Sequence, residues 1–267
     1  MSMKIMNLVS GSSGNSTLIG TERVTVLCDA GVSMKKIEEC LNAGGYTGRD
    51  IDAVLITHEH IDHIRGLGVL TRKYQIPVYA TEGTMRAALK NPALGKIDMS
   101  LIRILKPGDS FQVGDLLIRA HKIFHDAAEP VCYSFTDGVK RACIATDLGK
   151  TTADLIRELQ GCDFMLIEAN HDIRMLEAGP YPYPLKQRIL GDYGHLSNEA
   201  GGALIREILN EHVKEIRLGH LSKENNFPEL AMMTVKQELL GNPWSPDPDD
   251  LPIFIADRDN ADPIVEI

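Results

Sequence analysis

The chain has 267 residues, of which 43% are hydrophobic and 24% are charged, as in an ordinary globular protein. Its net charge of −9 argues against broad electrostatic attraction to nucleic acid, although metal ions bound in a site would supply positive charge locally. The sequence has no run of about 18 apolar residues, so no transmembrane helix is expected, and its first residues do not resemble a signal peptide. We therefore expect a single domain over residues 1–267, located in the cytoplasm, with no membrane partner.

Apolar runs alternate with helical patterns along the chain, and turn residues separate them. The expected strands, in chain order, cover residues 25–29, 53–57, 78–80, 101–104, 110–113, 116–124, 131–136, 141–146, 164–168, 215–218 and 253–256. The expected helices cover residues 33–43, 66–74, 84–89, 152–159, 198–210 and 228–240. Ser33 suits the N-cap of the first helix. Strands that first pair through hairpins and then alternate with helices are typical of an α/β protein whose layered sheets carry helices on the outside.

Residues 58–63 (HEHIDH) follow the expected strand at residues 53–57 and contain three histidines and two carboxylates. Histidine nitrogens and carboxylate oxygens are usual ligands of Zn²⁺ and similar divalent ions. In an extended chain, residues two apart face the same way, so His58 and His60 can hold one metal while Asp62 and His63 turn toward a second. A histidine-rich surface loop is the alternative, but this ligand pattern is rare by chance. The stretch therefore predicts a metal site.

Three later strands each end on a residue that could also bind a metal. His125 follows the strand at residues 116–124, Asp147 follows 141–146, and His220 follows 215–218. Singly, such a residue is usually part of a turn or cap. Because open α/β sheets place their sites at the carboxyl ends of strands, the recurrence of this pattern together with residues 58–63 predicts a two-metal site.

The order of the motifs CDAG, THEHIDH, FHD, ATDLG and LGHLS resembles the metallo-β-lactamase superfamily over about residues 4–257. The resemblance implies a four-layer αββα sandwich and two divalent ions, zinc or manganese with iron possible, and no organic cofactor. It implies that Asp29 does not bind a metal itself but orients the histidine stretch, since metal-bound histidines need such a hydrogen-bonding partner. The implied ligands are His58, His60 and His125 for the first metal, Asp62, His63 and His220 for the second, and Asp147 as a bridge between them.

Four longer tracts resemble the YycJ (WalJ) group within that superfamily, which is similar to RNase Z-type phosphodiesterases. They are SGSSGNS (residues 10–16), IEANHD (167–172), YGHLSNE (193–199) and GHLSKENN (219–226). The resemblance implies a hydrolase of ester bonds, a nuclease with a nucleic-acid substrate, and most simply a DNA exonuclease. In this class a hydroxide that bridges the two metals attacks phosphorus in line.

Asp62 and His195 are the candidate catalytic residues. The resemblance places His195 where related phosphodiesterases carry an additional histidine ahead of a helix, and imidazole suits a proton donor to the leaving sugar oxygen. The alternative for His195 is a plain position at the start of the helix at residues 198–210. His171 could approach the metals or substrate, or simply anchor its loop.

Four further residues are candidates for contact with the substrate or with the metal ligands. Ser13 and Asn15 lie in a Ser-Gly loop, which could present backbone N–H groups to phosphate or could be an ordinary tight turn. Lys186 and Arg188 lie in residues 178–189, which could guide a substrate, with Tyr181 or Tyr183 stacking on a base, or could be a plain surface excursion.

Two other functions fit nearly the same residues. A glyoxalase II-like hydrolase of thioesters or lactones would use almost the same ligand set. A non-catalytic metal-binding protein is the other alternative, and it is disfavoured because no expected ligand is missing from the sequence.

Overall fold

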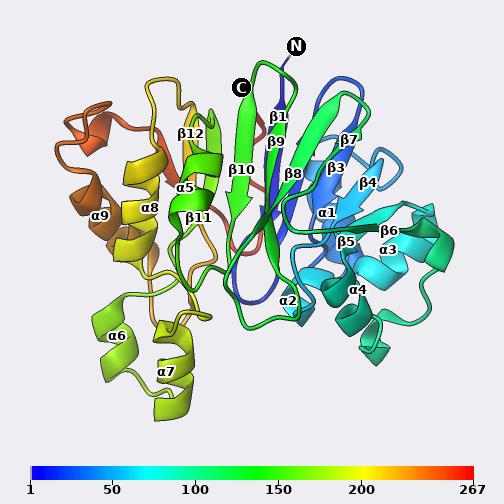
Figure 1. The fold of residues 1–267 in the computed structure, drawn as a ribbon, viewed down its shortest axis with the longest axis horizontal. Coiled ribbons are helices and arrows are strands. Elements are labelled where there is room, and N and C mark those ends of the chain that lie inside the picture. The colour runs from blue at the N-terminus through cyan, green and yellow to red at the C-terminus, as the bar shows by residue number, and fades with distance from the viewer. Residues whose placement is uncertain (1) are drawn as a thin grey trace. The chain divides into compact units, whose positions relative to one another are not determined.

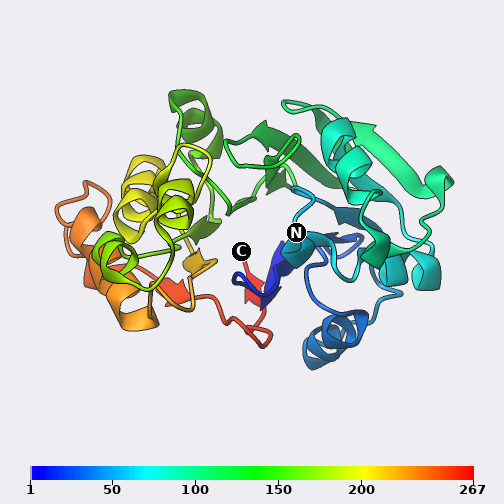
Figure 2. The same ribbon diagram turned by 90° about the horizontal axis from the view of Figure 1, so that it is seen from below.

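The computed structural model describes residues 2–267, which divide into two compact units. Unit 1 contains the chain up to Lys122, together with Ala127–Lys140 and Asp257–Ile267, and unit 2 contains Ile123–Asp126 and Arg141–Ala256. The ribbon is shown in Figure 1 and, turned by 90°, in Figure 2. The single domain expected over residues 1–267 stays a prediction.

A mixed sheet forms the centre of unit 1, in the order β14-β1-β2-β3-β4-β5-β6. Its first four strands in that order pair antiparallel and the remaining pairs are parallel, because α-helical crossovers precede β4, β5 and β6. The strands are β1 Lys4–Val9, β2 Ser16–Gly20, β3 Thr25–Cys28, β4 Ala53–Leu55, β5 Val78–Thr81, β6 Ile102–Leu105 and β14 Val265–Glu266.

Four α-helices and three more strands complete unit 1. The helices are α1 Met34–Ala43, α2 Ile61–Ile64, α3 Leu67–Tyr74 and α4 Glu82–Ala88, with 3₁₀ turns at Pro92–Leu94 and Met99–Leu101. Ser33 caps α1 as predicted, since its side chain accepts a hydrogen bond from the N–H of Lys36. An antiparallel ribbon contains β7 Ser110–Val113, β8 Leu116–Lys122 and β9 Val131–Thr136.

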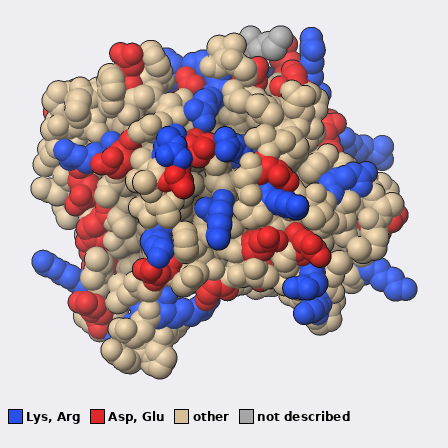
Figure 3. All heavy atoms as spheres, viewed as in Figure 1, with Lys and Arg blue, Asp and Glu red and all other residues tan. Residues whose placement is uncertain are grey.

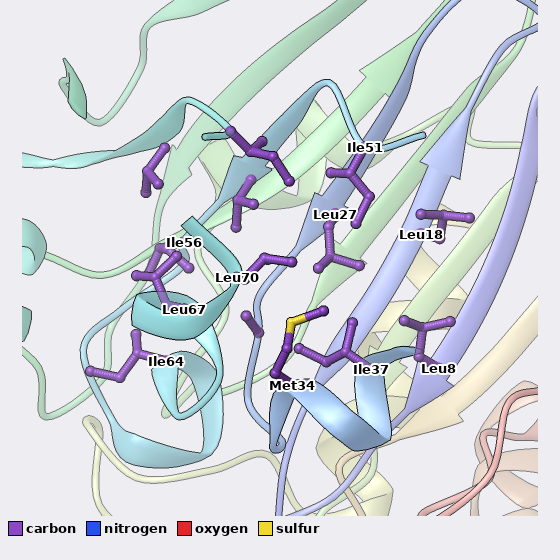
Figure 4. Packing of buried hydrophobic residues seen from close by; sticks show 14 of the residues in the cluster. Leu8, Leu18, Leu27, Met34, Ile37, Ile51, Ile56, Ile64, Leu67 and Leu70 are labelled. Carbon is purple, nitrogen blue, oxygen red and sulfur yellow. The ribbon is translucent and has the colours of Figure 1, made fainter. Parts of the chain in front are cut away.

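The apolar core of unit 1 lies between its mixed sheet and helices α1 and α3. Figure 4 shows Leu27 of β3, Ile37 of α1 and Leu70 of α3 pointing into this core, and all three are fully buried. Burial of one such side chain is worth about 1.5–3 kcal/mol. The core therefore holds the carboxyl ends of β3 and β4 in place, and with them the residues that follow each strand.

Unit 2 contains a parallel set of strands: β10 Arg141–Ala145, β11 Phe164–Glu168, β12 Glu215–Gly219 and β13 Ile253–Ile255. Its helices are α5 Ala153–Leu159, α6 Ile173–Ala178, α7 Tyr183–Leu190, α8 Asn198–Ile208 and α9 Pro228–Leu239, with a 3₁₀ turn at Pro248–Asp250. Helix α8 packs against α9, as Figure 1 shows in yellow and orange. Because the four strands run parallel, their carboxyl ends meet at one edge.

All predicted strands and helices are present, with ends that differ by at most two residues. No strand was predicted at β1, β2 or β14, and no helix at α2, α6 or α7. Helix α7 lies in the proline-containing stretch expected as a substrate arm or surface excursion. Its proline sits in the first turn, where a missing N–H costs little.

Charged side chains of both signs are interspersed over the face drawn in Figure 3. This face shows no broad basic patch and the chain is acidic as a whole, so attraction of a polyanion to this face would have to come from local groups. Among residues 2–267, no helix is both long and apolar enough to cross a bilayer.

Candidate functional site

Asp29 organises the candidate ligands of unit 1 from the position directly after β3. Its backbone is left-handed, with φ of 61°, which is uncommon for a residue other than glycine. Its carboxylate accepts hydrogen bonds from the Thr57 N–H at 2.9 Å, the Thr57 hydroxyl at 2.8 Å and His63 Nδ1 at 2.7 Å. Three such bonds offset the backbone strain and tie the end of β3 to the histidine stretch after β4.

The bond to Asp29 determines which nitrogen of His63 faces the cluster. Because Nδ1–H donates to the carboxylate, Nε2 carries the lone pair, and Asn15 Nδ2 donates to it at 3.1 Å. Asp62 Oδ2 lies 3.6 Å from the same Nε2. Asn15 also donates its backbone N–H to the Asp62 carbonyl, so the Ser-Gly loop braces the cluster, whereas Ser13 is exposed at the surface of that loop.

His58, His60 and His63 pack ring against ring. The ring centroids of His58 and His60 are 4.6 Å apart, and those of His58 and His63 are 4.1 Å apart. Thr57 Oγ1 lies 3.0 Å from His58 Nδ1. A Cβ on Gly31 would approach the Asp62 carbonyl oxygen to 1.7 Å, so the chain can bring Asp62 this close only past a glycine. Unit 1 thus gathers the four ligand candidates predicted from residues 58–63.

Unit 2 gathers its candidates at the carboxyl edge of its parallel strands. Asp147 follows β10, Glu168 ends β11, His220 follows β12, and His195 precedes α8. Ligand-type atoms of these four side chains all lie within 4.8 Å of one another. Asp147 and His220 have left-handed backbones, with φ of 61° and 55°. His125, also in unit 2, places Nε2 at 3.8 Å from Asp147 Oδ1, while its Nδ1 donates to the Gly194 carbonyl at 3.0 Å.

Glu168, which the sequence analysis did not select, is the organising carboxylate of unit 2. Its Oε1 accepts hydrogen bonds from His195 Nδ1 at 2.8 Å and from His220 Nδ1 at 2.9 Å. Its Oε2 accepts from the N–H groups of Leu148 and Leu196. Burial alone would raise the pKa of Glu168, but the charge of His195 and the two histidine hydrogen bonds hold that pKa at about 2. The carboxylate is therefore ionised at any working pH. Two sequence signals pointed to Glu168: it ends a predicted strand, and it lies in the tract IEANHD (167–172).

His195 faces the cluster and is partly open to solvent. Its side chain is 18% exposed, and its ring lies 5.1 Å from that of His125 and 5.2 Å from that of His220. Ser197, rather than His195, caps α8, since its hydroxyl accepts from the Ala200 N–H at 3.2 Å. The structure thus gives His195 a contact with Glu168 that a plain helix-start position would not need.

The remaining candidates lie outside this cluster of ligand-type atoms. His171 is buried, its Nε2 has no hydrogen-bond partner in the described chain, and burial lowers its pKa to about 4. Lys186 Nζ donates to the Glu177 carbonyl at 2.6 Å. Arg188 forms an ion pair with Asp126, which directly follows His125.

The donor atoms fit divalent metal ions. In His63, His125 and His220, Nδ1 donates to a carboxylate or carbonyl, which fixes the ring and presents Nε2, as is usual for metal-binding histidines. Two ligand atoms on one tetrahedral zinc lie about 3.3–3.6 Å apart, from metal–ligand distances of about 2.0–2.2 Å. The spacings in the Asp62–His63 and His125–Asp147 pairs, 3.6 and 3.8 Å, are close to this range.

The chain is similar to several known proteins. The sequence profile of the β-lactamase superfamily domain matches residues 24–213. The chain is 43% identical to the exodeoxyribonuclease WalJ of Streptococcus pneumoniae serotype 2 (strain D39) over 97% of this chain and 96% of that protein. It is 38% identical to the exodeoxyribonuclease YycJ of Bacillus anthracis over 90% of each chain.

The crystal structure of the metallo-β-lactamase fold protein YhfI from Bacillus subtilis superposes with a TM-score of 0.73 at 17% identity, covering 100% of this chain and 99% of that one. This likeness confirms the predicted fold class, and the named relatives confirm the expectation of a hydrolase. The chain belongs to the β-lactamase superfamily and has the metallo-β-lactamase fold.

Proposed function

We propose that the protein is a metal-dependent phosphodiesterase that degrades DNA from an end, as the names of its relatives state for them. The observation that carries the proposal is the hydrogen bond from His195 to the buried, ionised Glu168 beside Asp147 and His220. A histidine held in this way is suited to transfer a proton to the leaving oxygen of a phosphodiester. Such a proton donor adds general acid catalysis to the chemistry that a metal site would supply.

The metal ligands in this proposal are those implied by the family resemblance. Two divalent ions, zinc or manganese, would supply an activated water and neutralise charge on the phosphoryl oxygens. The support from the structure is that the residues cluster within each unit and that the histidine rings are held by Nδ1. The proposed ligands are His58, His60, Asp62, His63, His125, Asp147 and His220.

The residues of the chain divide the remaining work. Asp29 holds His63 and Thr57, so it orients the histidine stretch. Glu168 holds His195 and His220 by the same oxygen, so it links the proposed proton donor to a proposed metal ligand. With Nδ1 of His195 directed at Glu168, Nε2 is the atom that would deliver a proton to the leaving sugar oxygen. The partial exposure of His195 allows a substrate to reach it.

The first experiment is a cleavage assay on DNA duplexes labelled at the 5′ or 3′ end, with matching RNA and a thioester substrate in parallel. We expect stepwise loss of DNA ends that requires added Mn²⁺ or Zn²⁺. The variant His60→Ala should lose this activity. His212→Ala is the matched control, because His212 is an exposed histidine of unit 2 outside the cluster.

Two results would overturn the proposal. Hydrolysis of the thioester without cleavage of DNA or RNA would favour the glyoxalase II-like alternative. Tight metal binding with no turnover of any of these substrates would favour a non-catalytic metal-binding protein.

A further inference from the structure

An aromatic pair, one ring exposed and the other half-buried, lies beside the histidines of unit 2. The rings of Phe124 and Tyr193 have centroids 5.8 Å apart at an interplanar angle of 56°. Phe124 directly precedes His125, and Tyr193 stands two residues before His195. Tyr193 is 56% exposed, so one face or edge of its ring is open to solvent although it also packs on Phe124. The pair is part of neither the apolar core nor the proposed metal ligands.

The backbone connects this pair rigidly to both histidines. The Gly149 N–H donates to the Phe124 carbonyl at 2.7 Å, and His125 Nδ1 donates to the Gly194 carbonyl. A Cβ on Gly194 would meet the Ile189 carbonyl oxygen at 2.1 Å, so the loop that carries Tyr193 is closely packed against the end of α7. The backbone segments that carry the two rings are therefore tied to the segments that carry His125 and His195.

Lys150 places a positive charge at the same location. Its Nζ lies 4.6 Å from the centroid of Phe124, within the range of a cation–π contact. Lys150 also forms an ion pair with Asp192, the residue before Tyr193. Both side chains of that pair are more than a third exposed, and such pairs contribute little. Lys150 can therefore exchange Asp192 for a phosphate with small loss.

We propose that Tyr193 and Phe124 form a stacking platform for an unpaired base next to the cleaved phosphodiester, with Lys150 contacting a neighbouring phosphate. The base at the cleaved end is then unpaired when it binds, so a duplex end frays before it is cleaved, whereas a single strand binds directly. The position of the cleaved bond beside this pair rests on the proposed function. Every base has a face that can stack on an aromatic ring, so the platform accepts any sequence. In a chain with a net charge of −9, stacking also supplies affinity that a basic track would otherwise provide.

Tyr183 is the alternative candidate for stacking on a base, and its variant serves as the control. It is 72% exposed and begins α7 in the same unit, but it has no aromatic ring partner in the described chain. If exposed tyrosines bound DNA indiscriminately, Tyr183→Ala and Tyr193→Ala would weaken binding alike. The platform predicts that only Tyr193→Ala does so.

The test measures equilibrium binding of a labelled, cleavage-resistant phosphorothioate single strand by fluorescence anisotropy. A single abasic nucleotide is moved along this strand, one position at a time. We expect one abasic position near the end to weaken binding to the native protein roughly tenfold. Tyr193→Ala should weaken binding of the intact strand by a similar factor and lose the abasic effect. Tyr193→Phe, which keeps the ring, and Tyr183→Ala should bind as the native protein does.

The proposal is overturned if Tyr193→Ala binds within twofold of the native protein, or if the abasic penalty is equal in both. The phosphate contact is tested separately by Lys150→Ala, which should reduce the slope of log K against log salt by about 0.7. Lys236→Ala, which removes another ion-paired lysine of unit 2, should leave the slope unchanged. An unchanged slope in Lys150→Ala would remove Lys150 from the platform.

These binding results are independent of whether the proposed function holds. If the native protein shows the abasic effect but cleaves no DNA, the function fails and the platform stands. If it cleaves DNA ends but Tyr193→Ala behaves as the native protein, the platform fails and the function stands.

Discussion

In unit 1 the candidate ligands lie within one six-residue stretch, residues 58–63, whereas in unit 2 they come from separate segments of the chain. Each cluster is organised by one buried carboxylate. Asp29 contacts one residue of its cluster, His63, and the neighbouring Thr57. Glu168 contacts two candidates, His195 and His220. The first cluster is thus preformed by a short sequence motif, and the second exists only once the parallel strands have assembled.

Removal of one proposed ligand from each cluster should have the largest effect. We expect His60→Ala and Asp147→Asn each to reduce DNA cleavage by roughly a thousandfold or more, because a two-metal mechanism depends on both ions. Metal content by elemental analysis and cleavage rate are the measurements. His212→Ala should change neither. If either variant lost metal but kept full activity, DNA cleavage would not depend on both clusters.

Glu168→Gln should reduce kcat by about a hundredfold, since a misoriented proton donor typically costs a factor in the range of about 10²–10⁴. The reduction should persist at saturating metal concentration, because it acts through His195. The measurement is a kinetic titration with Mn²⁺. Full recovery of kcat by added metal would show that Glu168 supports only His220.

Asp29→Asn should act on metal affinity alone. The loss of its charge weakens the support of His63, and removal of such a partner typically costs about 10–100-fold in metal affinity. We expect kcat at saturating metal to stay within a few-fold of native. Isothermal titration with Zn²⁺ measures the change. If Asp29→Asn and Glu168→Gln gave the same pattern, the two carboxylates would not differ in role.

A smaller effect concerns pH and His171 of unit 2. Burial lowers its pKa from 6.5 to about 4, so the unfolded chain takes up a proton at a higher pH than the folded protein. The free energy of unfolding is therefore unaffected by His171 above pH 6.5. It decreases as the pH falls toward 4, by at most about 3 kcal/mol. Denaturant unfolding of metal-free protein should show a flatter pH dependence in His171→Gln. An identical dependence in both proteins would exclude His171 as the cause.

The sequence predicted what depends on local pattern. The apolar runs of β4, β10, β11 and β12 are bounded by polar residues, so the strands and the candidates at their ends could be identified. Residues 58–63 needed no tertiary information, because their spacing alone indicates metal ligands. The four-residue helix that begins at Ile61 inside this stretch could not be predicted, since it is too short to show a period.

Long-range features could not be predicted. Glu168 gained its role from His195, His220 and two backbone N–H groups that belong to different segments. Tyr193 became notable only through its contact with Phe124, which lies in another part of the chain. Neither set of contacts can be predicted from local spacing, because each forms only when distant strands and loops come together in the fold.

The left-handed backbones of Asp29, Asp147 and His220 limit how these positions can vary. Three of the four described non-glycine residues with positive φ are these candidates, and the fourth, Gln75, ends α3. Apart from glycine, mainly Asn, Asp and His tolerate this conformation, and glycine would remove the functional side chain. Most substitutions there would both remove the functional side chain and destabilise the left-handed backbone. These three positions should therefore be among the least mutationally tolerant in the protein, less tolerant than His60, whose φ of −62° suits most side chains.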